Sequence, residues 1–153
     1  MQTETTTLRE LTVRYSVRKD SGDQPLVVGR ALGNAANTAA AFMALLQDEP
    51  AEVFGILCLT TKHRVIAYHE VSRGTLDSTL VHPREVFKAA LLANAAAIVA
   101  GHNHPSGDQT PSPDDAELTR RLVAAGELLG VPVLDHVVIG DGRYYSFKEA
   151  GRL

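Results

Sequence analysis

The alternation of apolar and polar positions predicts a mixture of strands and helices along this chain. Leu11, Val13, Tyr15 and Val17 alternate with polar residues, which predicts a half-buried strand over residues 11–17. Further apolar runs bounded by turn residues predict a hairpin and three more strands. These elements are expected at residues 53–72, 96–102, 131–140 and 144–147.

Three other segments carry apolar residues at helical spacing. Asn34 is a candidate N-cap for a helix over residues 34–47, and Pro83 suits the first turn of a helix over residues 82–95. A third helix is expected over residues 112–130, with Gly130 as its C-cap. Its apolar stripe is expected to consist of Leu118, Leu122, Ala125 and Leu129. The resulting order, β-α-β-β-α-β-α-β-β, predicts an α/β or α+β sandwich in which helices flank a central mixed sheet.

Composition narrows the class of protein. The chain has 153 residues, of which 44% are hydrophobic and 22% charged, and this suits one soluble globular domain. A net charge of −3 gives no basic signature of nonspecific nucleic-acid binding. Cys58 is the single cysteine, so no disulfide forms within the chain, and we expect it in the core. We recognise no signal peptide and no apolar run of membrane-spanning length, and therefore expect a cytoplasmic protein without membrane contact.

Two histidines at the end of an apolar strand are the first candidates for chemistry. His102 and His104 are one residue apart and therefore share one side of an extended segment. Pro105 favours a bend after them, so that Asp115, at the start of the next helix, can return to the same place. Two imidazoles and one carboxylate form a ligand set that catalytic zinc uses, with a fourth position left open. His136, in the next strand, is either a partner of this site or a hydrogen-bonded strand residue.

The same loop also has a purely structural interpretation. Ser112, Pro113 and Asp115 match a helix capping box, in which the serine caps the helix and the aspartate bonds back to it. Asp114 is a second candidate ligand, which we expect to face solvent or to share the helix N-terminus. Capping does not require two histidines on one side of the preceding strand, and capping and catalysis are compatible.

The spacing of these residues resembles the JAMM (MPN+) metalloprotease motif, which is His-x-His, seven residues, serine, two residues and aspartate. His102, His104, Ser112 and Asp115 stand at its four positions. The stretches "HNHPSGDQTPS" and "LDHVVIG" are similar to the RadC-like branch of that superfamily. The resemblance covers most of the chain and implies a JAB/MPN-like, cytidine-deaminase-like sandwich.

The resemblance also implies a domain organisation. We expect a RadC-like JAB/MPN metallohydrolase domain over residues 31–153, with residues 1–30 as an N-terminal strand and loop segment of the same domain. Longer RadC proteins carry a helix-hairpin-helix domain before the catalytic domain. We expect this chain to lack that domain, which is the part most naturally associated with DNA.

In the activity that the resemblance implies, His102, His104 and Asp115 hold Zn²⁺, which activates a water molecule. The expected reaction is hydrolysis of a peptide or isopeptide bond in a protein or peptide substrate. Ser112 is expected to stabilise the oxyanion that develops at the attacked carbonyl.

The family motif also needs a glutamate on an early strand as the general base. Glu52 stands at the matching position, while Glu70 and Glu85 are competitors. Two other functions are considered beside the metalloprotease. A nucleic-acid-processing hydrolase fits the family's association with DNA repair, but the acidic net charge counts against it. An interaction module without activity is disfavoured because every motif residue is present.

Overall fold

A computed structural model describes residues 8–16, 29–74 and 80–153 of the chain. Its helices and strands follow the order expected from the sequence, apart from the first strand. In chain order they are α1 (Ala35–Leu46), β1 (Val53–Leu59), β2 (Val65–Arg73), α2 (Pro83–Leu92), β3 (Ala97–Asn103), α3 (Pro113–Leu129), β4 (Val133–Gly140) and β5 (Arg143–Ser146).

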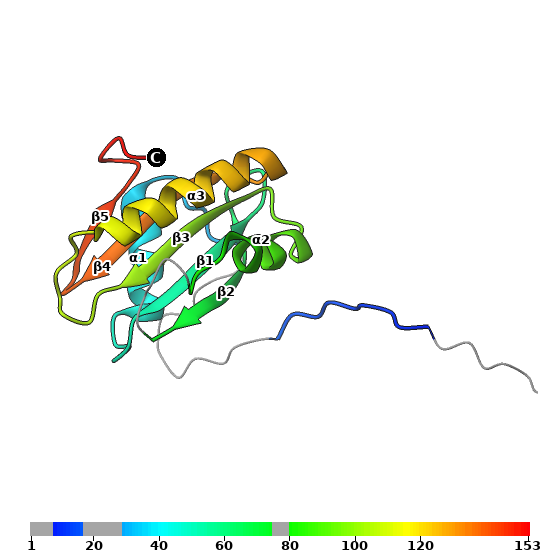
Figure 1. Ribbon diagram of the computed structural model, residues 1–153, viewed down its shortest axis with the longest axis horizontal. Helices are drawn as coiled ribbons and strands as arrows, with labels where there is room; N and C mark the ends of the chain where they lie inside the picture. The colour runs from blue at the N-terminus through cyan, green and yellow to red at the C-terminus, as the bar shows by residue number, and fades with distance from the viewer. Residues whose placement is uncertain (1–7, 17–28, 75–79) are drawn as a thin grey trace, which may run out of the picture.

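The five strands form one mixed sheet in the order β2-β1-β3-β4-β5 (Figure 1). Strands β3 and β4 are parallel, and the other neighbouring pairs are antiparallel. The parallel pair is connected through α3, the usual crossover for parallel strands. The mixed α/β fold class predicted from the sequence is therefore confirmed.

The helices cover both faces of the sheet, with α2 and α3 on one face and α1 on the other (Figure 1). Successive residues of β1 alternate between these two layers, as a pleated strand requires. Phe54 and Ile56 pack with α2 and α3, whereas Val53 and Leu57 pack with Phe42 of α1. Strands β1 and β3 are buried on both faces, which explains why β1 is continuously apolar and why β3 is apolar up to the residues that precede its His102–Asn103 end.

The predicted caps begin and end the helices. The side chain of Asn34 accepts a hydrogen bond of 2.8 Å from the Asn37 N–H at the start of α1. Gly130 ends α3 in the left-handed conformation, with φ of 73°, which favours glycine. The apolar stripe of α3 is shorter than predicted, because Leu129 is 46% exposed at the end of the helix.

The strand predicted over residues 11–17 is wrong for the part that the structure describes. Residues 8–16 form no regular secondary structure, and Val17 lies outside the described residues. Leu11 is 80% exposed and Tyr15 is 62% exposed, so their alternation with polar residues buries little apolar surface. A strand needs a hydrogen-bonded neighbour, and the described residues provide none for this segment. The assignment of residues 1–30 to the same domain stays a prediction, since most of them lie outside the described ranges.

Buried Asp135 of β4 stabilises the β5 edge of the sheet. Its carboxylate accepts hydrogen bonds from the Ser146 hydroxyl at 2.7 Å, the His136 N–H at 2.7 Å and the Lys148 N–H at 3.1 Å. Burial raises the pKa of Asp135, although these donors act in the opposite direction. Asp135 therefore secures β5 and the turn that follows it, on the side of β4 away from His136.

Two further expectations concern the core and the membrane. Cys58 is buried in β1, and burial raises the pKa of its thiol to about 11, which does not suit a catalytic thiolate. Among the helices of the described ranges, none combines the length and apolar character that crossing a bilayer requires.

Candidate functional site

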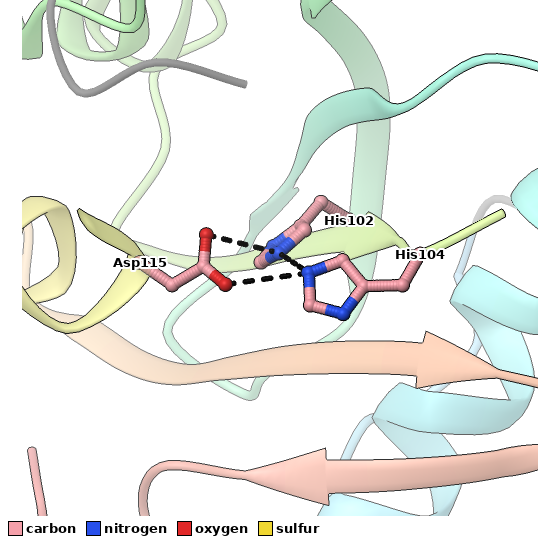
Figure 2. Close-up of side chains that lie close together, drawn as sticks. All are labelled: His102, His104 and Asp115. Carbon is pink, nitrogen blue, oxygen red and sulfur yellow. Dashed lines mark hydrogen bonds and ion pairs between the residues drawn. The ribbon is translucent and has the colours of Figure 1, made fainter. Parts of the chain in front are cut away.

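Strand β3 and helix α3 bring His102, His104 and Asp115 together at one point on the α3 side of the sheet (Figure 2). Ile98 and Ala100 of β3 pack against α2 and α3, and His102 continues this side of the strand. The chain bends after β3, and Gly107, with φ of 87°, adopts a conformation that favours glycine. The loop then returns the start of α3 over the two histidines, as the sequence predicts.

The three side chains are spaced as ligands of one metal ion. The Nε2 atoms of His102 and His104 are 3.1 Å apart. Each Nε2 atom lies 3.3 Å from a different carboxylate oxygen of Asp115. Two tetrahedral ligands at the usual zinc distances are separated by about 3.3–3.4 Å. The residues present therefore fit a tetrahedral ion with three protein ligands, and they could hold such a metal.

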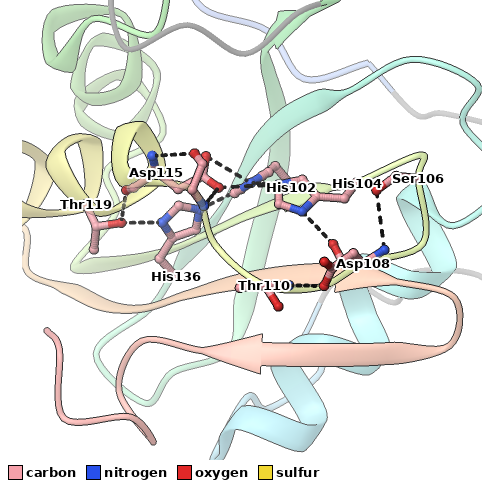
Figure 3. A network of polar contacts seen from close by, with 9 residues as sticks. His102, His104, Ser106, Asp108, Thr110, Asp115, Thr119 and His136 are labelled. Atoms are coloured by element: carbon pink, nitrogen blue, oxygen red, sulfur yellow. Dashed lines mark hydrogen bonds and ion pairs between the residues drawn. The ribbon is translucent and has the colours of Figure 1, made fainter.

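His104 is oriented by the loop that follows it (Figure 3). Its Nδ1 lies 2.7 Å from the carbonyl oxygen of Asp108. A carbonyl only accepts, so Nδ1 carries the hydrogen and Nε2 is directed to the site. The Asp108 side chain in turn accepts from the Thr110 N–H at 2.9 Å, which stabilises the turn. Contact with Asp115 raises the pKa of His104, and the nearby charge of Glu52 acts in the same direction.

Asp115 serves the helix and the site at once. One carboxylate oxygen accepts from the Ser112 N–H at 2.8 Å, while the Ser112 hydroxyl oxygen accepts from the Asp115 N–H at 3.1 Å. The predicted capping box is therefore present. Burial works to raise the pKa of Asp115, but the contacts with His102 and His104 outweigh it and hold the pKa well below its usual range. Asp114, the competing ligand, is exposed.

His136 is a direct neighbour of the site. Its Nε2 lies 2.8 Å from Nδ1 of His102, and its Nδ1 lies 2.6 Å from the Thr119 hydroxyl oxygen. The imidazole is fully buried between Phe54 and Phe147, and burial lowers its pKa well below the usual value. Of the two interpretations left open by the sequence, contact with the site is the one that the structure supports.

Glu52 lies beside His104 because of the register between β1 and β3. Phe54 pairs with His102 in this antiparallel ladder, and the next same-side position along both chains sets Glu52 against His104. Glu52 is half-buried and close enough for its charge to affect His104. A carboxylate that stands fifty residues before His102 in the sequence is thus brought to the same side of the sheet.

Asn103, between the two histidines, holds the backbone around Glu52. Its side-chain oxygen accepts from the Val53 N–H at 2.7 Å. Its amide donates to the carbonyl oxygens of Ala51 at 3.0 Å and Glu49 at 3.3 Å. The middle residue of the His-Asn-His triplet therefore faces away from the histidines and fixes the peptide groups on both sides of Glu52.

The competing glutamates belong to surface ion pairs instead. Glu70 contacts Arg73 at 2.6 Å, and Arg73 also contacts Glu49 at 2.6 Å. Glu85 in the first turn of α2 contacts Lys88 at 2.6 Å. These pairs account for both carboxylates without reference to the two histidines.

Two hollows lie beside the site. One, of about 860 Å³, is lined by His104, the loop that follows it and the ends of α1 and β4. The other, of about 510 Å³, is lined by Ser112, by Arg120 of α3 and by Arg152. Of the three candidate ligands, His104 lines the first hollow, while Ser112, the N-cap of α3, lines the second.

Two contacts of the site could not be found from the sequence. Thr119 reads as an ordinary polar residue of a helix, and the Asp108 carbonyl belongs to the backbone. A signal for Thr119 exists only in retrospect, since it lies one helical turn after Asp115 and shares its face.

Comparison with known proteins agrees with this geometry. The sequence profile of the RadC-like JAB domain matches residues 32–152. A UPF0758 protein of Caldanaerobacter subterraneus is 55% identical over 100 residues, which are 65% of this chain and 43% of the relative. A UPF0758 protein of Desulforudis audaxviator is 56% identical over 100 residues, which are 65% of this chain and 44% of the relative.

A UPF0758 protein of Alkaliphilus oremlandii is 53% identical over 98 residues, which are 64% of this chain and 42% of the relative. The matched segment spans less than half the length of each of these relatives. The profile match, by contrast, extends over most of this chain. The chain therefore belongs to the RadC-like JAB domain family of the JAMM/MPN superfamily.

Proposed function

We propose that this domain is a zinc-dependent hydrolase that cleaves peptide or isopeptide bonds. The observation that carries the proposal is the triangle of His102, His104 and Asp115, whose ligand atoms are separated by 3.1 Å, 3.3 Å and 3.3 Å. Two neutral imidazoles and one carboxylate suit Zn²⁺ and leave a fourth position for water, which is typical of catalytic sites. When bound, the ion supplies Lewis-acid activation and lowers the pKa of a water molecule toward about 7.

In this proposal Glu52 is the general base. It accepts the proton of the attacking water and delivers it to the amine that leaves. Its position on the same side of the sheet as His104 supports this role, and Asn103 limits the movement of the backbone that carries it. Glu70 and Glu85 are engaged in ion pairs elsewhere, so they are weaker candidates.

Ser112 is proposed to stabilise the oxyanion. Its oxygen accepts from the Asp115 N–H at 3.1 Å, which leaves its own hydrogen available for donation. A hydroxyl held at the start of a helix can therefore donate to the negative charge that develops on the attacked carbonyl. The cap that positions Asp115 also limits the rotation of this hydroxyl.

The proposed substrate is a protein or a peptide. The hollow of about 860 Å³ that His104 lines offers room for a segment of a polypeptide beside the candidate ligands. The acidic net charge of −3 favours protein over nucleic acid.

The proposal is tested by offering zinc-loaded and metal-free protein a mixed peptide library, an isopeptide-linked lysine reporter, and single- and double-stranded DNA. We expect amide cleavage that requires zinc and no cleavage of DNA. DNA cleavage that is lost in His104→Ala, together with intact peptides and isopeptides, would instead establish a phosphodiesterase.

A further inference from the structure

A buried chain of polar groups connects two of the three candidate ligands through residues that are not ligands themselves (Figure 3). The Thr119 hydroxyl donates to the carbonyl oxygen of Asp115 at 2.7 Å. The same oxygen lies 2.6 Å from Nδ1 of His136, and Nε2 of His136 lies 2.8 Å from Nδ1 of His102. The series of hydrogen bonds thus runs from α3 through β4 to β3, and these three elements hold or flank the site.

The direction of every hydrogen bond in this polar network follows from the first one, between Thr119 and Asp115. The Asp115 carbonyl oxygen only accepts, so the Thr119 hydroxyl donates its single hydrogen to that oxygen. The Thr119 oxygen then accepts from Nδ1–H of His136. A neutral imidazole has one donor and one acceptor, so Nε2 of His136 accepts from Nδ1–H of His102. Full burial between the rings of Phe54 and Phe147 favours the neutral form of His136, because a buried charge is costly.

These hydrogen bonds determine which ring nitrogen of His102 carries its hydrogen. With its hydrogen fixed on Nδ1, the other ring nitrogen of His102 keeps its lone pair for a metal ion. We propose that Thr119 and His136 are positioning residues that set the tautomer and ring orientation of His102, so that Nε2 is ready to bind the metal. This inference rests on the proposed metal site, and it deepens that site by assigning the residues that prepare it.

The same series of hydrogen bonds joins two candidate ligands on different elements, Asp115 of α3 and His102 of β3. Asp115 contributes its carboxylate to the site and its backbone carbonyl to the chain that ends at His102. A displacement of α3 relative to β3 therefore disturbs the carboxylate and the imidazole together. Partners of this kind typically change metal affinity by 10- to 100-fold when they are removed.

The decisive variant is Thr119→Val, which keeps the shape of the side chain and removes the hydroxyl. Nδ1 of His136 then loses its acceptor, and the hydrogen moves to Nε2 of His136. His102 must accept that hydrogen bond on Nδ1, so its own hydrogen moves to Nε2 and faces Asp115. Metal binding then has to reverse both tautomers, and we expect zinc affinity to fall by about 10- to 100-fold, measured by competition with a chromophoric chelator.

Two further variants distinguish the positioning role of the Thr119 hydroxyl from a general loss of packing. Thr119→Ser restores the hydroxyl and is expected to restore zinc affinity. Thr38→Val is a matched control, because Thr38 is also a buried helical threonine whose hydroxyl donates to the carbonyl four residues earlier, at 3.1 Å. Thr38 belongs to α1, on the face of the sheet opposite α3, and zinc affinity in this variant is expected to equal that of the wild type.

A second readout is independent of bound metal. Long-range ¹⁵N–¹H NMR of the metal-free protein at alkaline pH should place the hydrogens of His102 and His136 on Nδ1 in the wild type, and on Nε2 in Thr119→Val. Wild-type hydrogens on Nε2 would mean that Thr119 donates to His136 instead, and this result would overturn the proposal. Unchanged zinc affinity in Thr119→Val would also overturn it. A wild type that binds no zinc would refute the metal site itself, while the NMR result would still decide the tautomers.

Discussion

Replacement of Glu52 by Gln is expected to lower kcat by roughly 10²- to 10⁴-fold, the usual contribution of a general base. Glutamine keeps the size of the side chain but cannot accept the proton of the attacking water. Zinc affinity is expected to stay at the wild-type value, because Glu52 is not among the three candidate ligands. Steady-state kinetics on a peptide or isopeptide reporter, with zinc titration of the same preparation, measures both quantities.

Glu70→Gln is the matched control for this variant. Glu70 is a strand carboxylate of the same sheet, but it is exposed and contacts Arg73 at 2.6 Å. The activity of Glu70→Gln is expected to equal that of the wild type. If Glu52→Gln remains fully active while Glu70→Gln loses activity, the assignment of the base is wrong.

Replacement of Asp115 by Ala is expected to remove a metal ligand and a helix cap together. Zinc affinity should fall by more than the roughly 100-fold typical of residues that only support a ligand. The metal-free protein should also lose about 1 kcal/mol in free energy of unfolding, because the capping box of α3 loses one of its two hydrogen bonds. Calorimetric zinc titration and urea denaturation of the metal-free protein measure these two effects separately.

Asp114→Ala provides the control, since Asp114 stands beside Asp115 in the same helical turn but is exposed. It should retain zinc affinity. Equal zinc affinity in Asp115→Ala and the wild type would exclude Asp115 as a ligand, whatever the change in stability.

The sequence predicts most of the fold because its local signals agree with its hydrophobic pattern. Helix α3 combines a serine cap, a proline in the first turn and a C-terminal glycine, and each of them lies where expected. The predicted strand over residues 11–17 has the correct alternation but no partner among the described residues, and pairing is not a local property. Leu129 fits the apolar stripe of α3 but lies beyond the part of the helix that the sheet covers.

The features of the candidate site also fall into two groups, those predicted by local spacing and those that depend on how the strands pair. The alternation of His102 and His104 and the bend after them can be interpreted from spacing alone. The place of Glu52 depends on the pairing of β1 with β3, which residue spacing does not specify, and the family resemblance supplied it instead. The contact between His136 and Thr119 depends on β4 lying parallel to β3 beneath α3, so the sequence left the role of His136 open and gave no sign of Thr119.

We propose that His102, His104 and Asp115 form a metal site, and the most direct test of this site is the zinc content of the protein. Metal-free wild type and the double variant His102→Ala/His104→Ala should be dialysed against dilute zinc and analysed for bound metal. We expect about one zinc ion for each wild-type chain and none for the double variant. Wild-type protein that remains free of zinc with both histidines intact, or a double variant that binds as much zinc as the wild type, would contradict it.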